Sequence, residues 1–195
     1  MLKSIKMLSK RSSNAIALDI FMEDARRIES APFCDHRGSF EVYWDNLQLS
    51  TIGIKFQPCS STISYNEKAG TLRGLHYQRL PHSQAKLVSC INGSVLDVIA
   101  DLRPESQTYL HWSASELCAA SGCSIFIPHG FAHGFVTLTD HCTLAYLIEG
   151  DYQQFASATV RWDDPVLGIK WQVNSPILSE RDRTAPDFLL CDISC

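Results

Sequence analysis

The chain has 195 residues, of which 45% are hydrophobic and 19% charged, and its formal net charge is −4 at pH 7. This length and composition fit one domain with a sizeable core and exclude the disordered, collagen-like and coiled-coil classes. The mildly acidic balance argues against a nucleic-acid or membrane-surface partner, and no stretch approaches the about 20 apolar residues of a membrane span.

Residues 1–30 begin basic, continue Ser-rich and become partly apolar. Asp19 interrupts the apolar run after a few residues, so the segment is too short for the core of a signal peptide. We therefore expect an N-terminal extension over 1–30, a single domain over 31–195 and a cytoplasmic location. The eight cysteines are dispersed, which predicts reduced thiols rather than a disulfide framework.

Short stretches rich in β-branched and aromatic residues follow, separated by Gly and Pro. They cover 38–44, 70–78, 85–91, 94–102, 124–128, 134–138 and 142–148. Strands at this regular spacing favour an all-β sandwich or barrel. Helical periodicity is weak, and the only candidates are 20–30 and 175–185, where Ser179 is placed to begin a short helix or turn.

The stretch GTLRGLHYQ, residues 70–78, is a predicted strand that carries Arg73 and His76 where apolar residues would pack better. Strand alternation places His76 and Gln78 on one face and Arg73 on the other. A β-bulge at Gly74 would change this, because one extra residue reverses the alternation. We predict either such a bulge or a position for Arg73 at the strand end, where the face is less defined.

Two spacings resemble the two motifs of the cupin superfamily of small jelly-roll barrels. The first runs through Gly70, His76, Gln78, Lys86 and Gly93, and the second through Gly122, Pro128, Gly130 and His133. Metal-binding cupins have His-x-His and then Glu in the first motif, whereas here Gln78 and Lys86 stand at the second His and the Glu. An ammonium offers no lone pair to a cation, so we predict no metal and no cofactor. The expected fold is an all-β, cupin-type double-stranded β-helix (jelly roll) with short peripheral helices.

An imidazole and an ammonium inside a barrel suit the enolisation of a ketone. His76 can remove a proton from the carbon beside the carbonyl, while Lys86 stabilises the oxyanion that develops. The base needs a carboxylate to fix its tautomer, and Asp182 is the candidate. Tyr146 lies in a predicted strand with its polar tip available, and it is the natural acid to return a proton from the opposite face.

Several longer segments carry a more specific resemblance. They are GTLRGLHYQ, KLVSCINGSVLDVIADLRPESQTY, IPHGFAHGFVTL, LAYLIEGDY, VRWDDPVLGIKW and LSERDRTAP. In this order, over about residues 31–187, they resemble the nucleotide-sugar 3,5-epimerase family, of the dTDP-4-dehydrorhamnose 3,5-epimerase type. The resemblance implies inversion of C3, C5 or both in a nucleoside-diphosphate 4-keto-6-deoxy sugar, through an enolate. It implies the same catalytic quartet, with His76 as base, Asp182 as its partner, Tyr146 as acid and Lys86 beside the 4-keto oxygen.

The resemblance also implies a homodimer and a set of substrate-binding residues. These are Arg37, Arg73, Gln78, His133, Tyr152 and Arg181. Arg73 would bind the diphosphate, as would Arg37 reaching across from a dimer partner. Tyr152 would stack on the nucleotide base, and His133 would line the sugar pocket. Arg181 stands where the family usually has a lysine.

The chain departs from the family in its recognition residues. Ser61, Thr62 and Ile63 stand where the family has a Gln-Asp/Glu-Asn triplet, and Ser157 replaces a substrate-binding Glu. The catalytic quartet is intact, so the sequence indicates the chemistry more firmly than the sugar, the nucleotide or the number of centres inverted. Two alternatives stay open: a cupin sugar ketoisomerase, and a barrel that binds a nucleotide sugar without turning it over.

Overall fold

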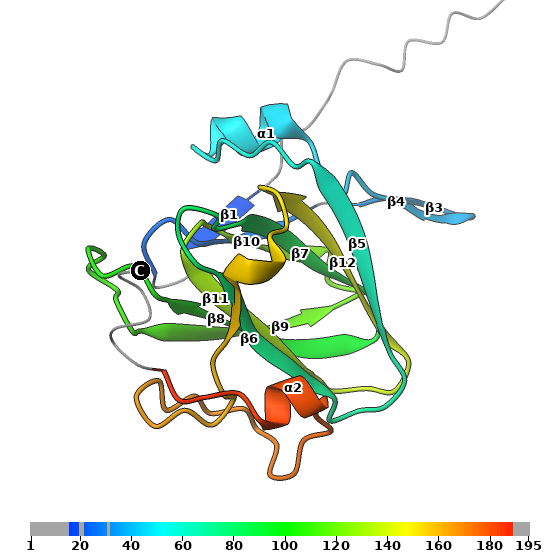
Figure 1. Cartoon of the computed structure of the whole chain (residues 1–195). Helices are drawn as coiled ribbons and strands as arrows, with labels where there is room; N and C mark the ends of the chain where they lie inside the picture. Colours follow the sequence, from blue (N-terminus) through cyan, green and yellow to red (C-terminus); the bar gives the residue numbers. More distant parts are fainter. Residues whose placement is uncertain (1–15, 20–21, 31, 189–195) are drawn as a thin grey trace, which may run out of the picture.

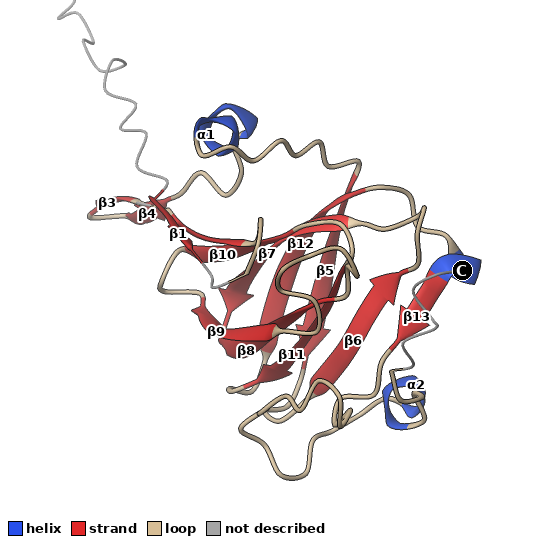
Figure 2. Cartoon of the chain, turned by 90° about the vertical axis from the view of Figure 1, so that its left-hand side faces the viewer, coloured by secondary structure: helices blue, strands red, loops and turns tan. Residues whose placement is uncertain are grey.

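Two antiparallel sheets packed face to face form the body of the protein (Figure 2). The computed structural model describes residues 16–19, 22–30 and 32–188. In spatial order, the larger sheet contains β1 (Ile16–Asp19), β2 (Arg26–Glu29), β10 (Cys123–Ile127), β7 (Ala85–Asn92), β12 (Cys142–Glu149) and β5 (Ser60–Asn66). The smaller sheet contains β13 (Ser157–Thr159), β6 (Leu72–Gln78), β11 (Phe131–Thr137), β8 (Ser94–Asp101) and β9 (Trp112–Cys118). The predicted jelly roll is confirmed.

The remaining described elements are small and lie outside the two sheets (Figure 1). They are a hairpin of β3 (Phe33–Asp35) and β4 (Gly38–Phe40), the helices α1 (Asn46–Thr51) and α2 (Glu180–Arg183), and the 3-10 turn η1 (Gln154–Ala156). In the part of the chain that the structure describes, no helix is long and apolar enough to span a membrane.

Two helix predictions have different outcomes. The Ser179 side chain accepts the Asp182 N–H and caps α2, as predicted. The helix predicted over 20–30 is wrong, because residues 26–29 form β2 between β1 and β10. Part of the segment assigned to an N-terminal extension is therefore paired into the larger sheet.

Strand alternation divides the core into an interior between the sheets and two outer layers. The interior cluster includes Val88, Cys90, Val95, Ile99, Ile125, Ile127, Phe131, Phe135 and Leu144. Outside the smaller sheet, Leu72, Leu75, Val98 and Val136 pack against the C-terminal residues Leu167, Ile169, Trp171 and Phe188. Outside the larger sheet, Ala85, Leu87 and Phe126 pack against Leu49, Ile54 and Phe56. On each strand, the side chains that alternate with these outer-layer residues point into the interior.

The pairing of β6 with β11 contains an irregularity that decides which way Arg73 points. His133 pairs with His76, and Phe135 pairs with Arg73. Two steps along β11 therefore oppose three steps along β6, so β6 holds one extra residue at Gly74 and its neighbour. Of the two alternatives predicted for Arg73, a bulge at Gly74 and a position at the strand end, the bulge is confirmed. It brings Arg73 onto the face that carries His76, because their partners on β11 are two residues apart and share a face.

Gly74 is required where β6 bulges, and its replacement by alanine should be costly. It has φ +116°, and a Cβ there would lie 2.6 Å from the Gly134 Cα and 2.7 Å from the His133 oxygen. We expect Gly74→Ala to lower the free energy of unfolding by about 2–4 kcal/mol in urea titrations. Gly53→Ala is the matched control, since Gly53 has φ +83° but nothing within 4 Å, and it should cost about 1 kcal/mol. Equal losses of unfolding free energy in the two variants would show that the close approach of Gly134 and His133 to Gly74 does not contribute.

Candidate active site

His76 and Asp182 form a buried-carboxylate dyad. Asp182 Oδ1 lies 2.6 Å from His76 Nε2, although the residues are 106 positions apart. Asp182 is buried, and its second oxygen accepts the Ser179 hydroxyl at 2.9 Å. Burial alone would raise the pKa of Asp182, but hydrogen bonds from His76, Ser179 and the Gly74 N–H outweigh it and lower that pKa. The carboxylate is therefore ionised and fixed.

This contact determines which nitrogen of His76 can act as a base. The Asp182 carboxylate accepts a proton from Nε2, which leaves the lone pair of the neutral imidazole on Nδ1. Within the described part of the chain, Nδ1 has no hydrogen-bond partner, and the His76 side chain is 38% exposed. A ligand can reach the basic nitrogen.

Lys86 supplies a positive charge from the facing sheet. On β7 it pairs with Ile127 of β10 and with Ile148 of β12. It lies on the same face of β7 as Val88 and Cys90, which point into the interior. The side chain is partly buried, and desolvation lowers the pKa of Lys86 to about 8, against the opposing effect of the Asp97 carboxylate. Lys86 is thus an ammonium near neutral pH that can lose its proton under mildly alkaline conditions.

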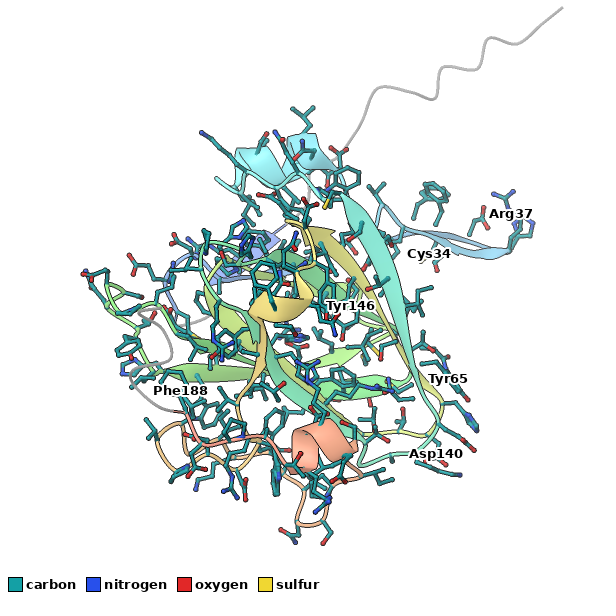
Figure 3. All side chains as sticks on the ribbon, viewed as in Figure 1. Cys34, Arg37, Tyr65, Asp140, Tyr146 and Phe188 are labelled. Atoms are coloured by element: carbon teal, nitrogen blue, oxygen red, sulfur yellow. The ribbon has the colours of Figure 1, made fainter. Side chains whose placement is uncertain are left out.

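Tyr146 lies inside the barrel (Figure 3) in contact with a second dyad. The His133 and Tyr146 rings meet edge to face with centroids 5.9 Å apart, and His133 Nε2 lies 2.7 Å from Asp97 Oδ2. Burial, with a smaller effect of the Asp97 charge, raises the pKa of Tyr146 far above its ordinary value. Tyr146 therefore keeps its proton at neutral pH and can donate it.

Arg73 points inward from β6 and is held by the edge of the larger sheet. Its Nε donates to Asn66 Oδ1 at 2.7 Å, and its Nη2 donates to the Tyr65 carbonyl at 3.4 Å. Asn66 is buried, and its amide donates to the Cys142 carbonyl at 3.3 Å. Among the described residues, Arg73 has no carboxylate partner, so its charge can pair with an anionic ligand.

The side-chain amide of Gln78 already makes hydrogen bonds to backbone groups. Its amide nitrogen donates to the His82 carbonyl at 2.7 Å and to the Asp151 carbonyl at 3.0 Å. Its oxygen accepts the Gln153 N–H at 2.7 Å. Both amide hydrogens are used, so Gln78 is poorly placed for the substrate contact that the sequence predicts, and that contact stays a prediction.

Arg181 and Tyr152 lie beside the strand that carries His76. Arg181 donates from Nε to Thr159 Oγ1 and from Nη2 to Ser157 Oγ, both at 2.9 Å. Thr159 pairs directly with His76 across β13 and β6, so Arg181 borders the dyad. The Tyr152 side chain, just before η1, is 64% exposed and available to a planar ligand.

Arg37 lies far from the other predicted residues. It follows β3 at the turn of the β3–β4 hairpin, where Asp35 accepts its guanidinium at 2.6 Å. Figure 3 shows this hairpin projecting away from the barrel that contains Tyr146. One chain alone does not bring Arg37 into the site.

The altered recognition triplet lies along β5, the edge strand beside β12. Thr62 pairs directly with Tyr146, which puts it on the interior side of the sheet. Ile63 points the other way and is 67% exposed. Of the three altered positions, Thr62 is the one placed to affect a ligand near Tyr146.

Asp97 and Asn66 were not identified from the sequence. Asp97 sits on β8 between the inward-facing Val95 and Ile99, and it is almost fully buried. A carboxylate in the middle of the apolar stretch VLDVIA was the only available signal. Asn66 offered none, because the Cys142 carbonyl that holds its amide is brought to it by the pairing of β5 with β12. In the described ranges, no group of three or more His, Cys, Asp or Glu side chains could hold a metal ion.

The interaction between Asp97 and Lys86 can be measured without a substrate. Asp97 is the carboxylate that holds the pKa of Lys86 up against desolvation. In an NMR titration of the lysine ¹³Cε signals, we expect one resonance that titrates near pH 8 and moves to lower pH in Asp97→Asn. Glu116→Gln, an acidic residue on β9, is the control and should leave that resonance in place. A Lys86 resonance whose titration is unchanged in Asp97→Asn would contradict this electrostatic interaction.

The jelly roll and its interior charges define the class of protein. A cupin-like barrel that presents the histidine of a His–Asp dyad on one sheet and a lysine with a protonated tyrosine on the other is suited to acid–base chemistry beside a carbonyl.

Comparisons with known proteins give the same class. The family model of dTDP-4-dehydrorhamnose 3,5-epimerase matches residues 19–189. The dTDP-4-dehydrorhamnose 3,5-epimerase of Sinorhizobium fredii is 35% identical over 175 residues, 87% of each chain. The crystal structure of the Bacillus anthracis dTDP-4-dehydrorhamnose 3,5-epimerase, with TDP and PPi bound, has a TM-score of 0.86 at 37% identity, covering 89% of this chain and 99% of that one.

A third relative acts at one centre. The structure of a 3'-monoepimerase from Streptomyces bikiniensis in complex with dTDP-quinovose has a TM-score of 0.80 at 32% identity, covering 86% of this chain and 85% of that one. The chain belongs to the dTDP-4-dehydrorhamnose 3,5-epimerase family, and it is an isomerase of the epimerase type.

Proposed function

We propose that the chain epimerises C3, C5 or both of a dTDP-linked 4-keto-6-deoxy sugar by proton abstraction and return through an enolate. The observation that carries this proposal is the placement of acid and base on facing sheets. His76 extends from β6 in the smaller sheet, whereas Lys86 and Tyr146 extend from β7 and β12 in the larger sheet. A sugar between the sheets would meet a base on one ring face and an acid on the other.

The proton transfers follow from this geometry. His76 Nδ1 takes the proton from the carbon beside the keto group, and the C–H electron pair forms a carbon–carbon double bond. The carbonyl electron pair moves to oxygen, where the Lys86 ammonium stabilises it. When the carbonyl re-forms, the same carbon takes a proton from the Tyr146 hydroxyl on the other face, which inverts the centre. Exchange with solvent restores His76 and Tyr146, while Asp182 stabilises the transient imidazolium.

The charged groups around the dyad suit a nucleoside diphosphate. Arg73 and Arg181 contact neutral groups rather than carboxylates among the described residues, so both can bind phosphate oxygens. Tyr152 is exposed and would stack on the base. The TDP bound to the Bacillus anthracis relative supports thymine as that base.

Hydrogen exchange in D₂O tests the proposal. The protein is incubated with dTDP-4-keto-6-deoxyglucose and followed by NMR. We expect deuterium at C3, C5 or both, with inverted configuration at the labelled carbon. A carbonyl that moves to a neighbouring carbon would identify a ketoisomerase instead. Binding without any exchange would identify a nucleotide-sugar-binding barrel and reject the epimerase.

We propose a homodimer in which Arg37 completes the site of the partner subunit. The hairpin that carries it has strongly exposed aromatic side chains, Phe33 at 59% and Phe40 at 73%. Complementation tests this arrangement. Arg37→Ala and His76→Ala should each be impaired, and mixing the two should restore activity, because one site of a mixed dimer then has both residues. If Arg37 serves its own chain, mixing restores nothing.

We also propose that the reaction takes place in the cytoplasm. The Cys90 and Cys142 sulfurs lie 3.7 Å apart as free thiols in the interior. Neighbouring unbonded thiols are typical of a reducing compartment.

A further inference from the structure

Gln78 ties together two segments that are distant in the sequence. It ends β6 on the inward face and is buried at 6% exposure. Its amide binds the backbone on both sides of Tyr152, through the Asp151 carbonyl and the Gln153 N–H, and it binds the His82 carbonyl of the following loop. One side chain thus fixes the residues before and after Tyr152 relative to the strand that carries His76.

Other contacts hold the same segment without enclosing Tyr152. The Gln84 amide donates to the Gly150 carbonyl at 3.0 Å, and the His82 and Phe155 rings meet edge to face at 5.1 Å. Within the described residues, the Tyr152 side chain has no hydrogen-bond or ring partner of its own. Its position therefore depends on its backbone, and Gln78 supplies the hydrogen bonds on either side of it.

We infer that Gln78 is a positioning residue that presents Tyr152 to the nucleotide, an inference that rests on the proposed function. A loop fixed before binding has already lost the conformational freedom that a loose loop would lose on binding. Gln78 therefore strengthens nucleotide affinity without touching the reacting atoms. This replaces the direct substrate contact expected from its sequence position, for which Gln78 has no amide hydrogen left.

Binding of dTDP by calorimetry, together with steady-state kinetics, tests the inference. Gln78→Met keeps the volume and removes all three hydrogen bonds. We expect Kd for dTDP and KM for the sugar nucleotide to rise about 10-fold, while kcat changes less than about 2-fold. Gln107→Met, at an exposed loop position, is the matched control and should change neither constant.

A double-mutant cycle separates positioning from a general structural role. In a Tyr152→Ala background, Gln78→Met should weaken dTDP binding by less than about 2-fold, because the side chain being positioned is gone. Hydrogen exchange should also accelerate at the amides of residues 151–153. If Gln78→Met does not fold, Gln78→Asn gives the same test, since its shorter side chain cannot reach both segments.

Three results would overturn the inference. They are an equal loss of affinity in both backgrounds, a fall in kcat at constant KM, and an unchanged Kd for dTDP. In each case the wild type still epimerises, so the proposed function survives. A wild type that neither exchanges deuterium nor binds dTDP would instead reject the proposed function, and this inference with it.

Discussion

His76→Ala should reduce deuterium exchange into the sugar by about 10²–10⁴-fold, the usual contribution of a general base. The variant keeps Lys86 and Tyr146 but has no group to accept the proton on the face opposite the tyrosine. Because His76 is 38% exposed, the substitution should leave the barrel folded. The measurement is the initial rate of deuterium incorporation by NMR, with the thermal midpoint recorded in parallel.

His111→Ala is the control for this prediction, because His111 is exposed and lies just before β9, away from the dyad. It should retain the wild-type rate. Asp182→Asn tests whether the tautomer of His76 matters while the imidazole itself is kept. An amide can donate to Nε2 and so favour the tautomer with the proton on Nδ1. Exchange should then fall while dTDP affinity is kept. Full exchange in His76→Ala would mean that another group is the base.

The sequence predicted the contacts that follow from motif spacing and local rules. The dyad was predicted because His76 and Asp182 each lie in a recognisable segment, and the cap at Ser179 fixes the start of α2, the helix that contains Asp182. The bulge at Gly74 was predicted because a lone Gly in a strand with polar residues on both faces conflicts with simple alternation. These inferences need only neighbouring residues or a known motif.

The contacts missed from the sequence depend on which strands become neighbours. Asp97 meets His133 only because β8 lies beside β11, and a carboxylate in the middle of an apolar strand carries no spacing signal. The sequence predicted that Gln78 contacts the substrate and missed its contacts with the backbone for a similar reason. Its backbone partners lie in loops 4 and 73 to 75 residues further along the chain, and no pattern in the sequence reveals that they meet. Strand order, not composition, decides these functions.

Lys86→Met should lower kcat by about 10²–10³-fold, because the enolate oxygen then loses the charge that stabilises it in the barrel. The pH profile of wild-type activity should show a matching fall at alkaline pH. The pKa of Lys86 is lowered to about 8, so the ammonium is present below that pH and lost above it. Activity should therefore fall as pH rises through about 8, and the residual activity of Lys86→Met should lack this fall.

The same substitution should change stability in the opposite direction. The pKa of Lys86 is lower in the folded protein than its ordinary 10.5, so between about pH 8 and 10.5 the unfolded chain binds more protons and the free energy of unfolding rises with pH. At pH 7 the folded state carries the full cost of the desolvated charge. Lys86→Met removes that cost at similar volume and should raise the free energy of unfolding by about 1–3 kcal/mol in urea.

Activity and stability together distinguish an electrostatic role for Lys86 from a packing role. A lysine that only fills space would leave the pH profile flat from 7 to 9.5, and its replacement would be neutral or destabilising. Lys170→Met, an exposed control, should change neither quantity. A more stable Lys86→Met variant with little activity would show that the fold keeps a charge in its interior at the expense of stability, where the reaction needs it. A less stable variant with normal activity would contradict both the burial of the ammonium and its place beside the enolate.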